Sequence, residues 1–213
     1  LNTGCVPSKA LLRTAKVLSL FKRSKDFGIQ HAEARFDFAE VMERVQRVIR
    51  EIEPHDSVER YTQLGVECIA GEARITSPWS VQVNGRTLTT RSIVIATGAE
   101  PFVPPIPGIR EVECLTSETV WNLRELPKRL LVLGGGPIGC ELAQAFARLG
   151  SQVTQVEMLP RILPREDPEF SEMVAQQMRA DGVRLLTGHK AARFSNKTLL
   201  CEHDGKEEQI AFD

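Results

Sequence analysis

The sequence predicts an α/β fold in which a β-α-β unit lies between two small antiparallel β-meanders. Three observations support this prediction. An apolar strand, a glycine-rich turn and a helix follow one another over residues 129–150, and a second strand follows at 151–157. Two segments with helical periodicity precede this unit. Short segments with strand-like patterns and turn residues lie on both sides of it. With 213 residues, the chain can form one large domain or two modest ones.

The composition is that of a globular protein without an unusual partner. Hydrophobic residues make up 42% of the chain and charged residues 26%, and the formal net charge is −1. Such a charge gives no electrostatic reason to expect nucleic acid or an anionic membrane as a partner. No apolar run approaches the roughly 18 residues of a membrane-spanning helix, and no signal-peptide pattern is present.

The chain contains five widely and irregularly spaced cysteines: Cys5, Cys68, Cys114, Cys140 and Cys201. An odd number without a C-x-x-C pair or a Cys/His cluster argues against a secreted disulfide framework and against a zinc site. We therefore expect a reducing, cytoplasmic environment and no bound metal. We interpret every cysteine except Cys5 as a small buried apolar residue.

Two helices are predicted near the start of the chain. The first spans residues 10–21, and Gly28 is a plausible stop after it. The second spans residues 37–52, because its apolar residues form one helical stripe: Val41, Val45, Val48, Ile49 and Ile52. Pro54 ends this helix, and a short amphipathic segment continues to Leu64.

The apolar period changes after Gly65, where the sequence predicts a small meander. Strands are expected within residues 65–75 and 80–90, joined to a buried strand at residues 93–96. Asn84-Gly85 is a strong hairpin-turn signal, because both residues tolerate positive φ.

A proline-rich connector, "EPFVPPIPGIREV" at residues 100–112, is the best domain boundary in the chain. We therefore expect one domain at residues 1–108 and another at 109–213. A short helix is predicted at residues 117–128, with Ser117 as its N-cap.

The second domain follows an alternating pattern of strands and helices. Strands are predicted at residues 129–135, 151–157 and 183–188, with helices at 137–150 and 167–182 between them. Residues 190–212 resemble the start of another meander.

The segment "VLGGGPIGCE" contains the G-x-G-x-x-G pattern of a dinucleotide site. Its glycines are Gly134, Gly136 and Gly139, and the acidic Glu157 lies 18 residues further along, at the end of the next strand. A strand before the pattern and a helix after it make this signal specific, whereas the glycines alone would be compatible with a turn that binds no ligand.

Each glycine has a distinct physical role in such a site. Gly134 permits the tight turn, Gly136 lets the backbone approach a diphosphate, and Gly139 lets the helix pack closely on the strand. The first helical turn, which includes Pro137 and Ile138, offers a partial positive charge to the diphosphate.

The acidic residue indicates which dinucleotide is bound. Glu157 is placed to accept hydrogen bonds from a ribose diol, and its carboxylate would repel a 2′-phosphate. NADH is therefore favoured over NADPH, although Arg161 lies nearby in the sequence and could offset this preference.

Cys5 lies at the start of the first helical region, in the run "LNTGCVPSKALL". A thiol at a helix N-terminus has its ionised form favoured, and a nearby lysine adds to this effect. Taken by itself, a lone cysteine is more often a small buried apolar residue.

Three motifs together change that interpretation. "LNTGCVPSKALL", "SIVIATGAEP" and "VLGGGPIGCELA" resemble the FAD-dependent pyridine nucleotide-disulfide oxidoreductases, in the order of that family and over essentially the whole chain. The segment "VTQVEMLPRILPREDPE" is similar to the dihydrolipoamide dehydrogenase and mercuric reductase branches. This resemblance implies a Rossmann-like FAD/NAD(P)-binding fold of the three-layer ββα type. Residues 1–108 would form part of the FAD domain, and 109–213 an incomplete NAD(P) domain.

The resemblance also assigns roles to individual residues. It implies that Cys5 is the charge-transfer thiol against the flavin, that Lys9 lies beside flavin N5, and that Glu141 is the ion-pair partner of this lysine. A cation near N5 stabilises reduced, anionic flavin.

Four further positions match segments of the family that contact FAD. Thr97 and Gly98 correspond to its "ATG" segment, and Gly71 and Ala73 lie where its meander passes the adenine end of the cofactor.

The same comparison leads us to expect an internal fragment of a larger enzyme. In the family the redox motif reads C-x-x-x-x-C, its second cysteine matches Cys5, and the first would immediately precede Leu1. The first FAD-binding glycine motif and the C-terminal dimerisation domain of the family have no counterpart in this sequence. We therefore expect the chain alone to be inactive as a disulfide reductase, and the parent enzyme to be a homodimer.

The implied reaction passes electrons from NAD(P)H through FAD to a redox-active disulfide, and then to a small disulfide or a mercuric ion. Two alternatives remain open from the sequence. One is an NADH oxidase or peroxidase of the same superfamily, which works with a single redox cysteine. The other is a non-catalytic NAD-binding module.

Overall fold

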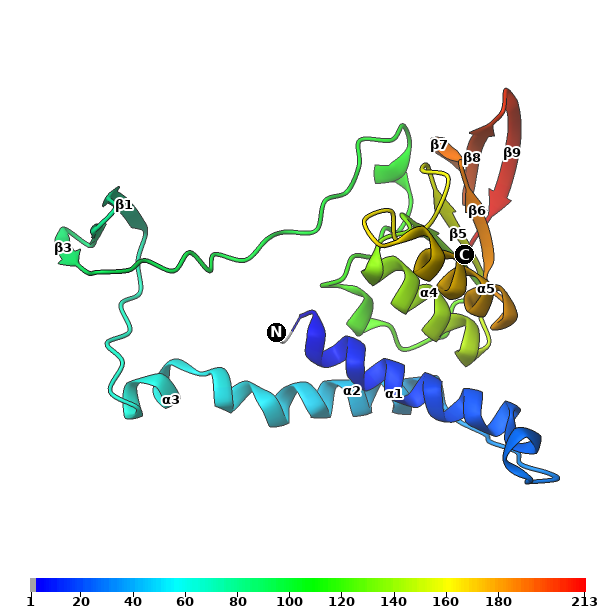
Figure 1. The fold of residues 1–213 in the computed structure, drawn as a ribbon, viewed down its shortest axis with the longest axis horizontal. Helices are drawn as coiled ribbons and strands as arrows, with labels where there is room; N and C mark the ends of the chain where they lie inside the picture. The colour runs from blue at the N-terminus through cyan, green and yellow to red at the C-terminus, as the bar shows by residue number, and fades with distance from the viewer. Residues whose placement is uncertain (1–2) are drawn as a thin grey trace. The chain divides into compact units, whose positions relative to one another are not determined.

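The computed structural model describes residues 3–213 (Figure 1) and contains two compact units. The large unit comprises the chain up to Ile49 together with Val103–Asp213, and the small unit comprises Arg50–Phe102. These compact units are not the two domains predicted from the sequence, and the predicted domain boundary after residue 108 stays a prediction.

Helix α1 of the large unit spans Cys5–Lys22 and begins earlier than the helix predicted for residues 10–21. Pro7 lies in its first turn, where the missing N–H removes no helical hydrogen bond. The α1 side chains that face the core are Ala10, Leu11, Ala15 and Leu18.

Helix α2 spans Phe38–Ile52, as predicted. The side chain of Asp37 accepts a hydrogen bond from the Ala39 N–H at 2.7 Å and so satisfies one of the unpaired donors at the start of this helix. Val41 and Val45 of the predicted apolar stripe are buried.

The β-α-β prediction is confirmed in the second half of the large unit. Three strands form a parallel sheet in the order β4-β5-β6. Two helices connect them, and the elements are β4 Arg129–Leu133, α4 Pro137–Leu149, β5 Gln152–Glu157, α5 Pro168–Ala180 and β6 Arg184–Thr187.

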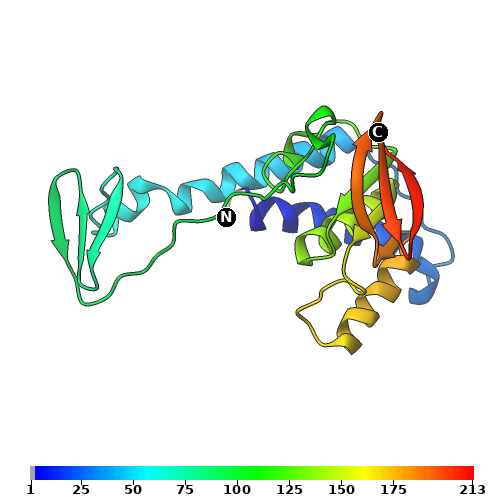
Figure 2. The ribbon, with the colours of Figure 1, turned by 90° about the horizontal axis from the view of Figure 1, so that it is seen from above.

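The predicted final meander is also present. It consists of β7 Lys190–Ser195, β8 Thr198–His203 and β9 Lys206–Ala211, paired antiparallel in that order. Figure 2 shows these strands in orange to red.

Alternation along β4 divides the large unit into three layers. Leu130 and Val132 pack into the core shared with the helices, whereas Leu131 and Leu133 pack against a second core that contains Phe194 of β7. Successive side chains of a strand point to opposite faces, so the helices cover one face of the parallel sheet and the meander covers the other. The predicted α/β class with three-layer ββα architecture is confirmed.

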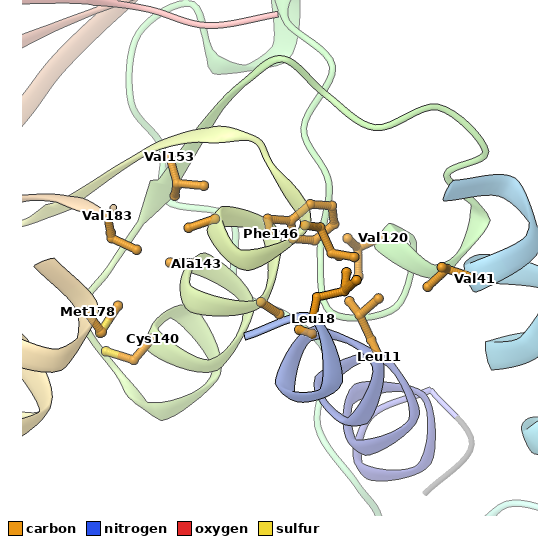
Figure 3. Close-up of a cluster of buried hydrophobic side chains, with 14 of the residues drawn as sticks. Leu11, Leu18, Val41, Val120, Cys140, Ala143, Phe146, Val153, Met178 and Val183 are labelled. Carbon is orange, nitrogen blue, oxygen red and sulfur yellow. The ribbon is translucent and has the colours of Figure 1, made fainter. Parts of the chain in front are cut away.

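The main core lies between α1, α2 and α4 and the helical face of the sheet. Figure 3 shows Leu11 and Leu18 of α1 beside Phe146 of α4 and Val120. Phe146 is 1% exposed and Leu11 is 0% exposed. Full burial of such a side chain contributes about 1.5–3 kcal/mol, so this cluster holds α1 to the nucleotide half of the unit.

The small unit contains α3 Val58–Gln63 and a three-stranded antiparallel sheet. Its strands are β1 Ala73–Ser77, β2 Ser80–Val83 and β3 Arg86–Thr89. The predicted turn joins β2 and β3, with φ of 48° at Asn84 and 74° at Gly85.

Short 3-10 helices complete the regular structure. They span Ser24–Phe27, Glu53–Asp56, Ile109–Glu111 and Val120–Asn122. Within residues 3–213, no helix combines the length and the apolar character needed to cross a bilayer.

The prediction of a buried strand at residues 93–96 is wrong. The strand predicted within residues 65–75 begins only at Ala73, later than expected. Among the described residues, no strand pairs with 93–96, and Val94 and Ile95 are 87% and 70% exposed. An apolar run forms a strand only when a neighbour supplies hydrogen bonds and a surface to bury it.

The helix predicted at residues 117–128 is also wrong. The chain forms turns and a single 3-10 helix there, and Ser117 is not an N-cap. The Trp121 indole N–H donates to the Ser117 oxygen at 2.6 Å, in the place of a helical backbone N–H. Pro127 has no N–H to bond the Leu123 carbonyl, which accepts from Arg124 at 2.9 Å.

Replacement of Phe146 by alanine is expected to lower the free energy of unfolding by about 3–5 kcal/mol, because it leaves a cavity between α1 and α4. Urea denaturation followed by far-UV circular dichroism measures this change. The matched control is Phe170→Ala, since Phe170 of α5 is 58% exposed and its loss should change stability by less than about 0.5 kcal/mol. Equal effects of the two substitutions would contradict the described core.

Candidate functional site

The glycine-rich loop joins β4 to α4 through a sharp turn. Gly134 has φ +95°, a conformation that L side chains rarely adopt. A Cβ on Gly139 would come within 2.5 Å of the Gly134 carbonyl oxygen, so the helix can approach the strand this closely only with glycine at 139. The first and third glycines of the pattern therefore have the backbone roles that the sequence predicts for them.

Unlike Gly139, Gly136 has open space around it, and it is the N-cap of α4. A Cβ there would meet nothing within 4 Å, and φ is −74°. The protein itself therefore does not require glycine at this position. A close ligand would require it, because the backbone N–H groups at a helix start can bind a diphosphate only if no side chain blocks the approach.

Glu157, the last residue of β5, contacts the glycine-rich loop through its side chain. Its carboxylate accepts hydrogen bonds from the Gly135 N–H at 2.5 Å and from the Leu159 N–H at 2.7 Å. A carboxylate has about four lone-pair sites, so two remain for other donors such as ribose hydroxyls.

No described contact joins Arg161 to the Glu157 carboxylate. Its guanidinium donates to the carbonyl oxygens of Pro164 at 2.9 Å and Glu166 at 3.3 Å, within its own loop. These bonds hold Arg161 in its own turn.

Sequence reasoning missed Gly135, the middle residue of the loop. A Cβ on it would lie 3.0 Å from atoms of both Glu157 and Ile162, and Ile162 is 1% exposed. It also missed Gln155, whose amide lies under the loop. No sequence signal marked Gln155, because β5 reads QVTQVE and contains other polar residues, so its burial shows only in the structure.

Cys5 is the first residue of α1, and its side chain is exposed. Ser8 secures this end of the helix, because its hydroxyl donates to the Cys5 carbonyl at 3.1 Å and its N–H donates to the Gly4 carbonyl at 3.1 Å. Lys9 follows Cys5 by one helical turn, and residues spaced by four lie on the same face of a helix.

Lys9 and Glu141 form an ion pair that joins α1 to α4. The ammonium contacts both carboxylate oxygens at 2.7 Å. The two side chains are 62% and 38% exposed, so the pair contributes only about 0–1 kcal/mol to stability. Its main consequence is geometric, because it ties the helix that carries Cys5 to the first turns of the helix that follows the glycine loop.

Trp121 holds the residues immediately before Cys5. Its side chain is buried, and its indole N–H donates to the Thr3 carbonyl at 2.8 Å. The Trp121 carbonyl in turn accepts from the Gln46 amide of α2 at 3.0 Å. No local sequence pattern indicates these contacts, because they join residues far apart in the chain.

The remaining predicted cofactor residues belong to the small unit. Gly71, Ala73, Thr97 and Gly98 are all exposed. A Cβ on Gly71 would overlap the side chain of Asn84, whose amide donates to the Ala70 carbonyl at 2.8 Å. The FAD contact expected of these four residues stays a prediction.

The cysteines separate into two classes. Cys140 and Cys201 are buried as predicted, but Cys68 and Cys114 are exposed, which contradicts the interpretation of them as buried residues. Burial raises the pKa of Cys140, and it raises the pKa of Cys201 to about 11, with the nearby Glu208 carboxylate adding to the second shift. In the part of the chain that the structure describes, no cluster of three His, Cys, Asp or Glu side chains is arranged to hold a metal.

Comparisons with known proteins agree with this arrangement. The family profile described as pyridine nucleotide-disulphide oxidoreductase matches residues 1–213. Mercuric reductase of Staphylococcus aureus is 35% identical over 216 residues, which cover 100% of this chain and 40% of that protein. Dihydrolipoyl dehydrogenase of Acholeplasma laidlawii is 35% identical over 218 residues, which cover 100% of this chain and 65% of that protein.

Solved structures show the same similarity. The Cu(II) complex of the HOCl-induced flavoprotein disulfide reductase RclA from Escherichia coli matches with a TM-score of 0.72 and 29% identity, covering 98% of this chain and 44% of that one. The chain thus spans 40% and 65% of the two curated relatives, less than two thirds of either.

The burial of the thiols predicts their reactivity. In the native chain, DTNB at pH 8 should rapidly modify the exposed Cys5, Cys68 and Cys114, because only thiolates that reagent can reach will react. Cys140 and Cys201 should react only after denaturation in urea. Absorbance of the released thiolate counts both sets, and Cys5→Ser should remove one thiol from the fast set. Rapid native reaction of all the cysteines would contradict the two buried positions.

Proposed function

The chain belongs to the pyridine nucleotide-disulphide oxidoreductase family, and we propose that it carries the dinucleotide site and one redox cysteine of a flavoprotein that passes electrons from NADH through FAD to a disulfide. The dithiol so formed would reduce a small disulfide or a mercuric ion. The names of the similar proteins, mercuric reductase, dihydrolipoyl dehydrogenase and flavoprotein disulfide reductase, support both substrate classes.

The observation that carries this proposal is the ion pair between Lys9 and Glu141. It joins a helix that begins with an exposed thiol to the helix that follows a glycine-rich loop, at 2.7 Å between charged atoms. Electron transfer from a dinucleotide to a thiol pair needs these two parts in a fixed relation. A dinucleotide-binding module without redox chemistry would not need an ammonium held one helical turn from an exposed thiol.

The residues present fit both cofactors. The space at Gly136 and the two remaining acceptor sites of Glu157 suit a diphosphate and a ribose diol. The exposed ammonium of Lys9, one helical turn from the Cys5 thiol, suits a flavin ring that becomes anionic on reduction. FAD would supply the conversion of a hydride into electrons that a disulfide can accept. Lys9 would stabilise the negative charge, Glu141 would hold Lys9, and Cys5 would lie against the ring.

The choice of NADH follows from charge. Glu157 would present its carboxylate to the ribose, and the guanidinium of Arg161 is bound to carbonyl oxygens of its own loop. A 2′-phosphate would therefore meet a negative charge without a paired cation. Thr97, Gly98, Gly71 and Ala73 would contact FAD. A cytoplasmic location and a homodimeric native protein complete the proposal.

Replacement of Gly136 by alanine tests the dinucleotide site. It should leave the melting temperature unchanged, because a Cβ there meets nothing within 4 Å, and it should weaken NADH binding at least tenfold by blocking the diphosphate. Isothermal titration calorimetry measures the dissociation constant. Gly4→Ala is the control for an added methyl group at a helix N-cap, since open space also surrounds Gly4, and it should leave NADH affinity unchanged. Unchanged NADH affinity in Gly136→Ala would contradict the site.

The same titration tests the coenzyme preference. NADH should bind at least tenfold more tightly than NADPH, and Glu157→Gln, which removes the charge, should narrow this ratio. Tighter binding of NADPH by the unmodified chain would overturn the assignment of Glu157.

Replacement of Cys5 by serine in the larger parent enzyme tests the redox proposal. NADH-dependent reduction of lipoamide or mercuric ion should fall at least a hundredfold, because the disulfide can no longer form. NADH binding should not change. The control is Cys114→Ser, an exposed cysteine outside α1, which should retain full activity. Reduction of oxygen or peroxide in place of disulfides would favour an oxidase or peroxidase instead.

A further inference from the structure

Gln155 lies in the middle of β5, the central strand of the parallel sheet, and is 1% exposed. Its neighbours Val153 and Val156 are buried apolar residues. A central parallel strand covered on both faces is usually apolar, and burial of an amide there is unfavourable unless it makes hydrogen bonds. The presence of glutamine at this position therefore needs a reason.

The nitrogen and the oxygen of the Gln155 side-chain amide differ in their hydrogen bonding. Its nitrogen donates to the Gly134 carbonyl at 2.8 Å and lies 3.6 Å from the sulfur of Cys140. Its oxygen is buried, and among the described residues no group donates to it. An unsatisfied buried acceptor destabilises the fold, whereas a leucine or valine would fill the space without this penalty. Stability alone does not explain the residue, but its contact with the glycine loop does.

That contact fixes one particular peptide group. The Gly134 carbonyl accepts from Gln155, and the N–H of the same peptide, on Gly135, donates to Glu157 at 2.5 Å. Gln155 and Glu157 are two residues apart and so lie on the same face of β5. The two side chains therefore hold the Gly134–Gly135 peptide at both its ends.

The held peptide connects the two parts of the dinucleotide site. Its carbonyl is the atom that α4 approaches at Gly139, and its N–H orients the carboxylate proposed to receive the ribose. The Gly135 carbonyl is held as well, by the Leu163 N–H at 2.7 Å and by the Cys140 thiol at 3.4 Å. Rotation of the peptide would move both the loop and Glu157.

We propose that Gln155 is a positioning residue for the dinucleotide, which fixes the Gly134–Gly135 peptide so that the loop and Glu157 are already arranged for the diphosphate and the ribose. This inference rests on the proposed function of the loop. It adds a residue that touches neither cofactor nor substrate and acts through the backbone and Glu157. An already arranged site binds more tightly because less conformational entropy is lost on binding.

Replacement by leucine separates this role from a structural one. Gln155→Leu keeps a similar volume and removes both the unpartnered oxygen and the hydrogen bond to the Gly134 carbonyl, so a gain and a loss in stability oppose each other. The melting temperature should therefore change little. The dissociation constant for NADH should increase roughly five- to tenfold, the equivalent of one lost hydrogen bond.

Gln46→Leu is the matched control. The Gln46 amide also donates to a backbone carbonyl, that of Trp121 at 3.0 Å, but Gln46 belongs to α2 and has no described contact with the loop. Its replacement should leave NADH affinity unchanged. A lower melting temperature with unchanged NADH affinity in Gln155→Leu, or equal weakening in Gln46→Leu, would overturn the proposal.

A second measurement keeps the inference separate from the proposed function. Amide hydrogen exchange at Gly135 and Gly136, measured by NMR without ligand, should be faster in Gln155→Leu than in the unmodified chain or in Gln46→Leu. If the unmodified chain binds neither NADH nor NADPH while exchange increases as expected, the proposed function fails and the positioning of the loop by Gln155 stands. If exchange does not change, the positioning role fails, whatever the affinity for NADH.

Discussion

The close approach of α4 to the end of β4 is the constraint on which the large unit depends. At this point a single Cβ on Gly139 would come within 2.5 Å of the Gly134 oxygen, so the backbones almost touch. This approach sets the position of the helix start over the loop. It also sets where Glu141 emerges, two residues later, to meet Lys9 at 2.7 Å. Further along, it directs Phe146 into the core shared with α1. One backbone contact thus governs the loop, the ion pair and the packing of the thiol-bearing helix.

The sheet transmits this arrangement because both of its faces are buried. Alternate residues of β4 pack toward the helices and toward the meander, so the strand cannot shift without disturbing two cores. β5, between β4 and β6, has the same two-sided burial, with Val153 in one core and Val156 in the other. The two β5 side chains that contact the loop, Gln155 and Glu157, therefore stand on a rigid strand. Groups held this way keep their positions more accurately than groups on a loop.

The β-α-β unit and the meanders could be predicted because their signals are local. These signals are the spacing of apolar residues, the glycines at 134 and 139, and the turn at Asn84-Gly85. Each depends on only a few consecutive residues, and the structure agrees with them. The errors have the opposite origin. Residues 93–96 have the composition of a buried strand, but strand formation needs a neighbour, and no described residue supplies one. The helix expected after Ser117 is lost because the Trp121 side chain occupies the Ser117 carbonyl, a bond that leaves no periodic trace, and because Pro127 has no N–H to continue the helix. Gln155 and Trp121 were missed at the site because their partners lie far away in sequence.

Stability and function are carried by different residues in this fold. A half-exposed pair such as Lys9–Glu141 contributes about 0–1 kcal/mol, and a typical hydrogen bond about 0.5–1.5 kcal/mol, whereas truncation of a buried Phe146 costs about 3–5 kcal/mol. Residues of the site can therefore be changed without loss of the fold. Gln155 extends this separation, because its buried, unpartnered oxygen lowers stability while its nitrogen orders the loop. A group that opposes stability and arranges a binding surface is what a site built for a specific ligand requires, whereas a turn that only connects a strand to a helix would be better served by an apolar side chain.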